Sequence, residues 1–232
     1  MNSPLQNPGA SMTMKKAVVF GSTGFVGAYV LQELLSSPDY EQVIAVARKD
    51  LNISHPKLRV LIADYDSVPA LKDQLAVDEV FIALGTTKNK TPDKREYYRI
   101  DHDYPVLAAT LAKEGGAKSV LVVSAVGSDP DSSIPYVKTK GETDRDIINL
   151  GFDHTHIFRP SMIMGDRKEK RRLEKTLMKL WSVIDVFFIG GAKKYRGSSG
   201  PDIARAMMLA AKRPSDKVNI YYWQEMHDLL AG

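Results

Sequence analysis

The chain of 232 residues contains no cysteine. Disulfide bonds, zinc or iron–sulfur centres held by cysteine, and every mechanism with a cysteine nucleophile are therefore excluded. A chain without cysteine fits a reducing compartment. We expect a cytoplasmic protein with no metal centre.

Long apolar runs are also missing from the sequence. None approaches the roughly 18 residues needed to cross a bilayer, so stable membrane insertion is not expected. The first 13 residues lack the basic start and the apolar stretch of a signal peptide. Because Met12 and Met14 are both possible start sites, we expect residues 1–14 to form a flexible tail.

Charge of one sign is in only small excess. The 32 lysines and arginines against 28 aspartates and glutamates give a net charge of +4. This excess suits an anionic ligand, and no motif for nucleic-acid recognition accompanies it, so no nucleic-acid partner is expected. We expect the basic run at residues 167–179 to be a solvated helix face rather than a surface for an acidic partner or a membrane.

What the sequence does contain is a regular alternation of short apolar runs with longer helical patterns. The predicted strands are residues 16–20, 42–47, 58–63, 79–83, 119–123, 154–158 and 217–222. The predicted helices are residues 25–36, 68–75, 95–113, 135–150, 168–183 and 201–212. Because most strands are continuously apolar, they are expected to be parallel and buried on both faces.

This alternation predicts an α/β fold of the Rossmann type, a doubly wound parallel sheet with a small C-terminal cap region. We expect a single domain over residues 15–232. Residues 161–200 would contribute a small cap over the substrate.

A glycine-rich loop follows the first predicted strand directly. Its residues are Gly21, Ser22, Thr23, Gly24, Phe25, Val26 and Gly27. The glycines of this G-x-x-G-x-x-G pattern allow a tight turn and let a pyrophosphate approach the main chain, while the N-terminus of the next helix favours the anion. Glycines also make ordinary turns, but the position between the first strand and the first helix predicts dinucleotide binding.

The end of the second strand indicates which dinucleotide is bound. An acidic residue there would bind the ribose 2′-hydroxyl of NAD, whereas this strand is followed by Arg48 and Lys49. Arg48 suits a 2′-phosphate, so we predict NADP(H); the alternative is a pair of solvated surface cations. Asp64 and Tyr65 follow the third strand, where Asp64 could bind the adenine amino group or cap the next segment. Further candidates for cofactor contact after the fourth strand are Leu84, Gly85, Thr86 and Thr87.

Tyr136 and Lys140 form a Y-x-x-x-K pair on a predicted helix, so they share one helix face. An ammonium group beside the phenol would lower the phenol pKa from about 10 and make the tyrosine an acid–base group near neutral pH. Ser124 lies at the carboxyl end of the fifth strand, where it could orient a substrate carbonyl. The alternative is that Tyr136 packs its ring and Lys140 is a solvated helix residue.

Taken together, these segments resemble the atypical branch of the short-chain dehydrogenase/reductase superfamily, in particular the HIV Tat-interacting-protein-like family. The resemblance covers about residues 15–230. It is carried by GSTGFVG, ARK, ALGTTKNK, RIDHDYPVLAATLAKEGGAKSVLVVSAVGS, PYVKTKGE, FRPSMIMGDR and MHDL. It implies a Rossmann fold, NADPH binding and a catalytic set of Ser124, Tyr136 and Lys140, and it places Pro160 beside the nicotinamide.

The ordered loop, serine, tyrosine and lysine predict an NADPH-dependent reductase of a small carbonyl compound, with Tyr136 as the acid. The superfamily often has a catalytic asparagine on the helix after the fourth strand, where this chain has Asp101. That departure and the short cap leave an alternative, an NADPH-binding redox sensor with little catalysis. We expect a monomer or homodimer that binds a small carbonyl or alcohol.

Overall fold

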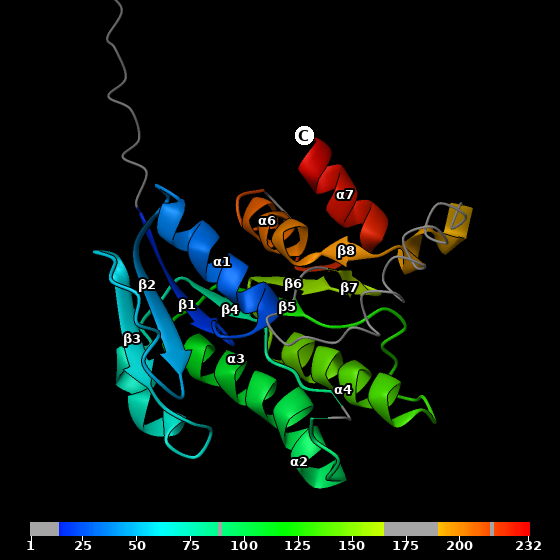
Figure 1. Cartoon of the computed structure of the whole chain (residues 1–232), viewed down its shortest axis with the longest axis horizontal. Helices are drawn as coiled ribbons and strands as arrows, with labels where there is room; N and C mark the ends of the chain where they lie inside the picture. Colours follow the sequence, from blue (N-terminus) through cyan, green and yellow to red (C-terminus); the bar gives the residue numbers. More distant parts are fainter. Residues whose placement is uncertain (1–13, 88–89, 165–189, 214–215) are drawn as a thin grey trace, which may run out of the picture.

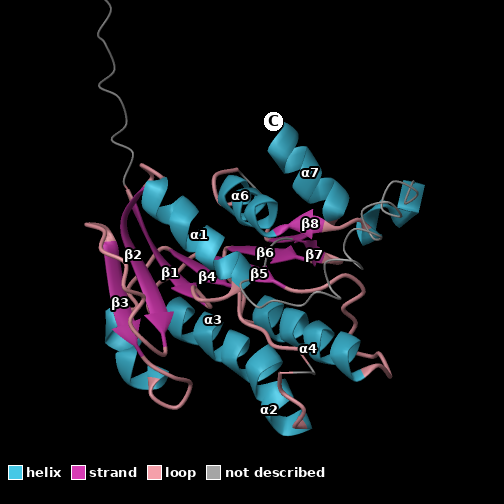
Figure 2. Cartoon of the chain, viewed as in Figure 1, coloured by secondary structure: helices cyan, strands magenta, loops and turns pink. Residues whose placement is uncertain are grey.

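The computed structural model describes residues 14–87, 90–164, 190–213 and 216–232. Within these ranges, seven strands form one parallel sheet in the order β3-β2-β1-β4-β5-β6-β9 (Figures 1 and 2). The strands are β1 (Lys15–Phe20), β2 (Tyr40–Ala47), β3 (Leu58–Ile62), β4 (Glu79–Ile82), β5 (Ser119–Val123), β6 (His154–Phe158) and β9 (Val218–Tyr221). The chain builds outward from β1 to β3 and then returns to place β4 beside β1, which confirms the predicted Rossmann-type fold. Ligands of such sheets bind at the carboxyl ends of the strands, at this reversal.

The centre of the sheet is apolar on both faces. On one face, the paired residues Val18, Ile44 and Val80 of β1, β2 and β4 are buried, and on the other face their neighbours Val19 and Phe81 are buried in a second cluster. Toward the edges the burial falls, and Ile62 of β3 and Ile220 of β9 are exposed. Burial on two faces explains why the central strands are continuously apolar rather than alternating.

Helices cover both faces of the sheet. They are α1 (Phe25–Ser36), α2 (Lys94–Tyr98), α3 (Tyr104–Glu114), α4 (Pro135–Asn149), α6 (Gly200–Ala210) and α7 (Trp223–Ala231). Figure 1 shows α1 and α6 on one face and α3 and α4 on the other, with α7 against α6. None of the helices in the described ranges is both long and apolar enough to cross a bilayer.

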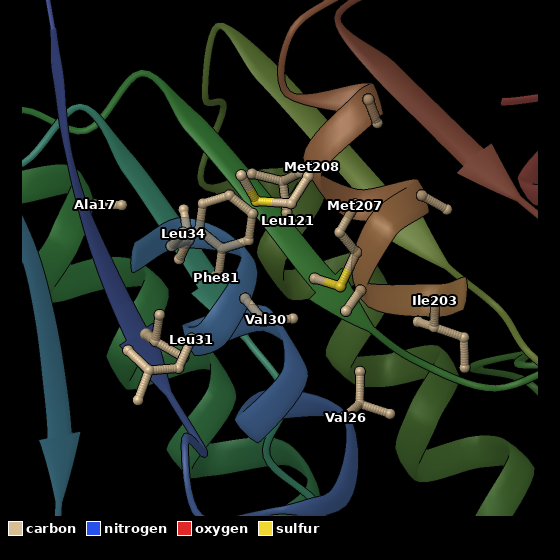
Figure 3. Packing of buried hydrophobic residues seen from close by; sticks show 14 of the residues in the cluster. Ala17, Val26, Val30, Leu31, Leu34, Phe81, Leu121, Ile203, Met207 and Met208 are labelled. Atoms are coloured by element: carbon tan, nitrogen blue, oxygen red, sulfur yellow. The ribbon is translucent and has the colours of Figure 1, made fainter. Parts of the chain in front are cut away.

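The core between α1, α6 and the sheet fixes the position of α1, and therefore of the glycine loop that precedes it. Val30 and Leu34 of α1 pack with Phe81 of β4 and Met207 of α6 (Figure 3). Each such fully buried side chain stabilises the fold by about 1.5–3 kcal/mol. Gly200, at the start of α6, permits this close packing, because a Cβ there would lie 2.7 Å from the ring of the α1 residue Phe25.

The helix predicted at residues 95–113 is divided in the structure. A π-helical turn, η2 (Arg99–Asp103), separates α2 from α3, and it buries Asp101 and His102. The Thr143 hydroxyl of α4 donates a hydrogen bond of 2.9 Å to the Asp101 carbonyl. Such π-helical turns are rare and insert one extra residue into a helix, which a 3.6-residue pattern does not reveal.

Two shorter segments complete the described chain. The helix predicted at residues 68–75 is a 3₁₀ helix, η1 (Val68–Gln74), with Pro69 in its first turn. A second 3₁₀ turn, η4 (Gly190–Tyr195), precedes β8 (Ser198–Ser199), which pairs in parallel with β7 (Ile163–Met164). The helix predicted at 168–183 and most of the expected cap lie outside the described residues.

Candidate functional site

The glycine loop joins β1 to α1 as a turn that only glycines can form. Gly21 has φ +89°, in the left-handed region that favours glycine, and its carbonyl accepts the Gly24 N–H at 2.9 Å. A Cβ on Gly27 would lie 2.1 Å from the Gly21 carbonyl oxygen. Gly24 is the N-cap of α1 and has no side chain to cap the helix. The N-terminus of α1 is therefore suited to an anion, because the helix dipole favours negative charge there.

The same loop holds a buried polar atom that suits a phosphate. The Ser22 hydroxyl is buried and has no hydrogen-bond partner among the described residues. A buried donor without a partner costs about 1–3 kcal/mol, which a phosphate oxygen would offset. The glycine turn, the uncapped helix N-terminus and Ser22 together fit the pyrophosphate of a dinucleotide.

The loop after β4 lies against the glycine loop. A Cβ on Gly21 would lie 2.5 Å from the Ala83 carbonyl oxygen. Further along this loop, the Thr86 N–H donates to the Asp101 carboxylate at 2.8 Å, and the Thr86 hydroxyl lies 2.9 Å from the Thr91 hydroxyl. The structure therefore brings the predicted residues 84–87 to the same edge of the sheet as the glycine loop.

The residues predicted to contact the adenosine part lie after β2 and β3. Arg48 and Lys49 are both exposed. Asp64 accepts the Ser67 N–H at 2.9 Å, and this bonding to Ser67 holds the pKa of the Asp64 carboxyl below its usual value. Asp64 therefore bonds to the residue that precedes η1, while Ser67 is the N-cap of that helix. Tyr65 stacks on Tyr104, with ring centroids 3.8 Å apart.

Tyr136 and Lys140 lie one turn apart on α4, as the spacing predicts. The Tyr136 side chain is 46% exposed, whereas Lys140 is buried and its ammonium lies 2.8 Å from the Asp101 carboxylate. Lys140 lowers the Tyr136 pKa, as expected, but it does not decide the net direction. Loss of solvent around the phenol raises the pKa and Asp101 raises it again, so that the net direction is upward.

Ser124 lies buried at the carboxyl end of β5, where the sequence predicts it. Its hydroxyl is 3.1 Å from the Ser128 hydroxyl. Burial raises the pKa of the Asp144 carboxyl on α4, and interactions with Ser124 and Arg159 oppose that rise. Ser124 therefore lies close to the helix that carries Tyr136 and Lys140.

Arg159 extends this network to the C-terminal helix. Its guanidinium donates to the Asp144 carboxylate at 2.9 Å and to the Tyr222 hydroxyl at 3.1 Å, next to the first residue of α7. The neighbouring Pro160 is buried, and its carbonyl accepts the Val126 N–H at 2.9 Å. These bonds fix the turn after β6 beside the loop that follows Ser124.

Sequence reasoning missed two members of this cluster. Asp101 stood out as a departure from the superfamily, but its ion pair with Lys140 was not anticipated, because the π-helical turn that buries it was not anticipated. Asp144 was overlooked although it lies four residues after Lys140 and therefore on the same helix face. A search of that face for buried polar residues would have found it.

A model of the NAD(P)H-binding family matches residues 21–181, which is more than half of the chain. The protein belongs to the NAD(P)H-binding family. It is similar to Protein FMP52, mitochondrial, of Candida albicans, with 35% identity over 164 residues that cover 68% of this chain and 72% of the relative. The Saccharomyces cerevisiae protein of the same name is 32% identical over 67% of this chain and 68% of its own length.

Solved structures of nucleotide-binding enzymes share the fold. MoeE5, solved in complex with UDP-glucuronic acid and NAD, superimposes with a TM-score of 0.65 and 20% identity, covering 88% of this chain and 75% of that one. The Bordetella bronchiseptica enzyme WbmH, solved with NAD+, gives a TM-score of 0.66 at 16% identity and covers 90% of this chain and 75% of that one. At these identities the likeness concerns the fold alone.

The expectation of a cytoplasmic protein is wrong, because the curated relatives of this family member are named as mitochondrial proteins. The absence of cysteine suggested a reducing compartment, but it does not distinguish one such compartment from another. A location is read from a targeting signal rather than from the folded core, so the residues that predicted the fold carried no information about it.

Proposed function

We propose that this protein is an NADPH-dependent reductase of a small carbonyl compound, of the atypical short-chain dehydrogenase/reductase type and similar to the HIV Tat-interacting-protein-like family. One observation carries the proposal: the buried Lys140 lies one helical turn from Tyr136, at the same sheet edge as the glycine loop. Ser124, buried at the carboxyl end of β5 and close to Asp144 of the same helix, supports it. Residues 15–232 are proposed to act as one domain, with residues 161–200 as the cap over the substrate.

Each residue has a distinct task in this proposal. The glycine loop holds the pyrophosphate at the N-terminus of α1, and Lys140 donates to the hydroxyls of the nicotinamide ribose. When bound, NADPH supplies the hydride for the carbonyl carbon. Tyr136 gives its phenolic proton to the carbonyl oxygen, which Ser124 orients by a hydrogen bond. Pro160 and residues 84–87 line the cofactor.

The substitution Tyr136→Phe tests the acid. It removes one hydroxyl from a half-exposed ring, so the fold and the affinity for NADPH should stay nearly unchanged. We expect kcat for carbonyl reduction to fall at least 100-fold, because proton transfer by a positioned side chain contributes about 10²–10⁴-fold. NADPH oxidation with a panel of small aldehydes and ketones gives kcat, and calorimetry gives the affinity.

Tyr98→Phe is the matched control, because the Tyr98 ring stacks on His102 rather than facing the proposed cofactor. Turnover should survive that change. Full turnover by Tyr136→Phe would refute the assignment of the acid. A wild-type protein that binds NADPH but reduces no carbonyl of the panel would contradict the reductase and favour the redox sensor.

NADP(H) rather than NAD(H) is proposed as the cofactor because exposed Arg48 and Lys49 follow β2 in place of an acid. Arg48→Asp should weaken NADPH binding at least tenfold more than NADH binding, since charge-assisted bonds to the 2′-phosphate are lost. Calorimetric titration with both nucleotides measures this. Lys118→Asp, the same charge change just before β5 at the opposite sheet edge, should leave both affinities unchanged. Equal losses for the two nucleotides in Arg48→Asp would refute the assignment.

A further inference from the structure

We propose that Asp101 is a positioning residue that neutralises Lys140 and thereby keeps the Tyr136 phenol protonated, so that the site reduces carbonyls rather than oxidising alcohols near neutral pH. The inference rests on the proposed function, because it assigns a role inside that site. It concerns a residue that differs from the asparagine expected at this position.

The ion pair between Asp101 and Lys140 is the most deeply buried charged contact in the site. The two charged atoms are 2.8 Å apart, and their side chains are 1% and 8% exposed. Little water screens the pair, so the attraction acts at a much lower effective dielectric constant than at the surface. The negative charge of Asp101 therefore offsets the positive charge of Lys140.

Asp101 is held in this position from several sides. Its second carboxylate oxygen accepts the Thr86 N–H at 2.8 Å from the loop after β4. Its carbonyl accepts the Thr143 hydroxyl at 2.9 Å from α4, and the π-helical turn η2 directs the residue into the core. The carboxylate cannot move away from Lys140 without breaking its bond to Thr86, and the bond from Thr143 fixes the backbone that carries it.

Loss of solvent and two charged groups act on the Tyr136 phenol. Loss of solvent raises the phenol pKa, Lys140 on α4 lowers it, and Asp101 on η2 raises it. Tyr97 on α2 also interacts with Tyr136 and is itself a neutral phenol with a raised pKa. Asp144, one turn beyond Lys140, is paired with Arg159 at 2.8 Å. The phenol is therefore not exposed to an unbalanced positive charge.

The protonation state of Tyr136 decides whether carbonyl reduction or alcohol oxidation can begin without a prior proton transfer. In reduction, the carbonyl carbon gains a hydride from the reduced nicotinamide and the oxygen gains the Tyr136 proton, so the C–O π bond breaks while C–H and O–H bonds form. The phenolate that remains takes a proton from water. Oxidation of an alcohol runs these steps in reverse and needs the phenolate at the start. A neutralised Lys140 stabilises the phenolate less, so reduction is favoured.

The substitution Asp101→Asn separates the charge of this residue from its shape. Asparagine keeps an acceptor oxygen for the Thr86 N–H but cannot form the ion pair with Lys140. We would label the tyrosines of the full chain with ¹³C at Cζ and titrate the ligand-free protein by NMR, using Tyr136→Phe to assign the signal. Asp101→Asn should lower the Tyr136 titration midpoint by about one pH unit, because the Lys140 charge is no longer offset. A midpoint that stays or rises overturns the proposal.

Two further variants make the test decisive. Asp103→Asn removes a carboxylate from the same turn, but Asp103 contacts His102 at 2.8 Å, so the Tyr136 midpoint should not move. An equal shift in that variant would contradict specific pairing. Lys140→Gln should raise the midpoint, and it decides the question if Asp101→Asn does not fold; an unchanged midpoint there overturns the proposal.

The titration does not depend on any substrate or nucleotide. If calorimetry shows no binding of NADPH while the midpoints shift as expected, the proposed function fails and the role of Asp101 in setting the proton state stands. If NADPH binds and carbonyls are reduced while Asp101→Asn leaves the midpoint unchanged, the inference about Asp101 fails alone.

Discussion

Two lysine–carboxylate pairs lie near opposite ends of β4, and they differ in how completely they are satisfied. At the amino end, Lys15 contacts Glu79 at 2.6 Å, and the buried Tyr40 hydroxyl donates to the second oxygen of Glu79, also at 2.6 Å. At the carboxyl end, Lys140 contacts Asp101 at 2.8 Å. Each pair joins a lysine ammonium to a carboxylate, so the two pairs differ in their surroundings rather than in their charged groups.

The two lysines differ in their surroundings. The Lys15 side chain is 39% exposed, so water solvates its ammonium, and both oxygens of its partner Glu79 are occupied. Lys140 is 8% exposed, and among the described residues Asp101 is its one ion-pair partner. A lysine ammonium has three donors, so Lys140 keeps donors for a ligand. The comparison indicates that a saturated pair stabilises the fold, while an unsaturated buried pair serves a binding site.

Removing the saturated pair should produce the largest effect on stability. Glu79→Ala leaves the Tyr40 hydroxyl buried without an acceptor and separates Lys15 from its partner. We expect the free energy of unfolding to fall by about 3 kcal/mol, since breaking a buried pair costs about 3–5 kcal/mol and Lys15 is partly solvated. Urea denaturation measures this loss, and NADPH affinity should stay within about twofold.

The matched control is Glu41→Ala, which removes a half-exposed glutamate 3.7 Å from Lys16 on neighbouring strands. Exposed pairs contribute about 0–1 kcal/mol, so its stability should barely change. A loss of NADPH affinity in Glu79→Ala without a loss of stability would break the comparison, because the amino end would then serve the site as well.

A smaller free-energy change is expected when a methyl group is placed beside the Asp101–Lys140 pair. In Gly85→Ala the added Cβ would lie 3.3 Å from the Asp101 carboxylate and 3.5 Å from the Lys140 ammonium. Gly85 does not have a positive φ, so alanine brings no backbone strain. We expect NADPH affinity to fall about tenfold, equivalent to about 1.4 kcal/mol, because the methyl group shields the remaining Lys140 donors.

Stability should change by less than about 1 kcal/mol in Gly85→Ala, as measured by urea denaturation. The two variants distinguish the two ends of β4. Glu79→Ala should lower the stability but not the NADPH affinity, and Gly85→Ala should lower the NADPH affinity but not the stability. Unchanged affinity in Gly85→Ala would mean that the donors of Lys140 do not reach the cofactor.

The fold was predictable because its signals are local. Apolar strands such as β5, the glycine turn at Gly21 and the proline at the start of α4 each act through neighbouring residues in the chain. The doubly wound parallel sheet followed from the alternation of strand and helix. The π-helical turn η2 was not predictable in this way, because a single inserted residue hardly changes the apolar pattern over residues 95–113.

The order of the residues along the chain was enough to predict which groups lie at the carboxyl edge of the sheet, because the ends of parallel strands meet there. These groups are the glycine loop, residues 84–87, Ser124, and the helix face of Tyr136 and Lys140. The electrostatic interactions between them depend on the packing of distant elements. Asp101 and Lys140 lie 39 residues apart, and whether their charges offset each other depends on burial and on a distance of 2.8 Å between side chains of different elements. Spacing along the chain specifies a shared face, but the pKa of Tyr136 depends on every charge and every water that surrounds the phenol in three dimensions.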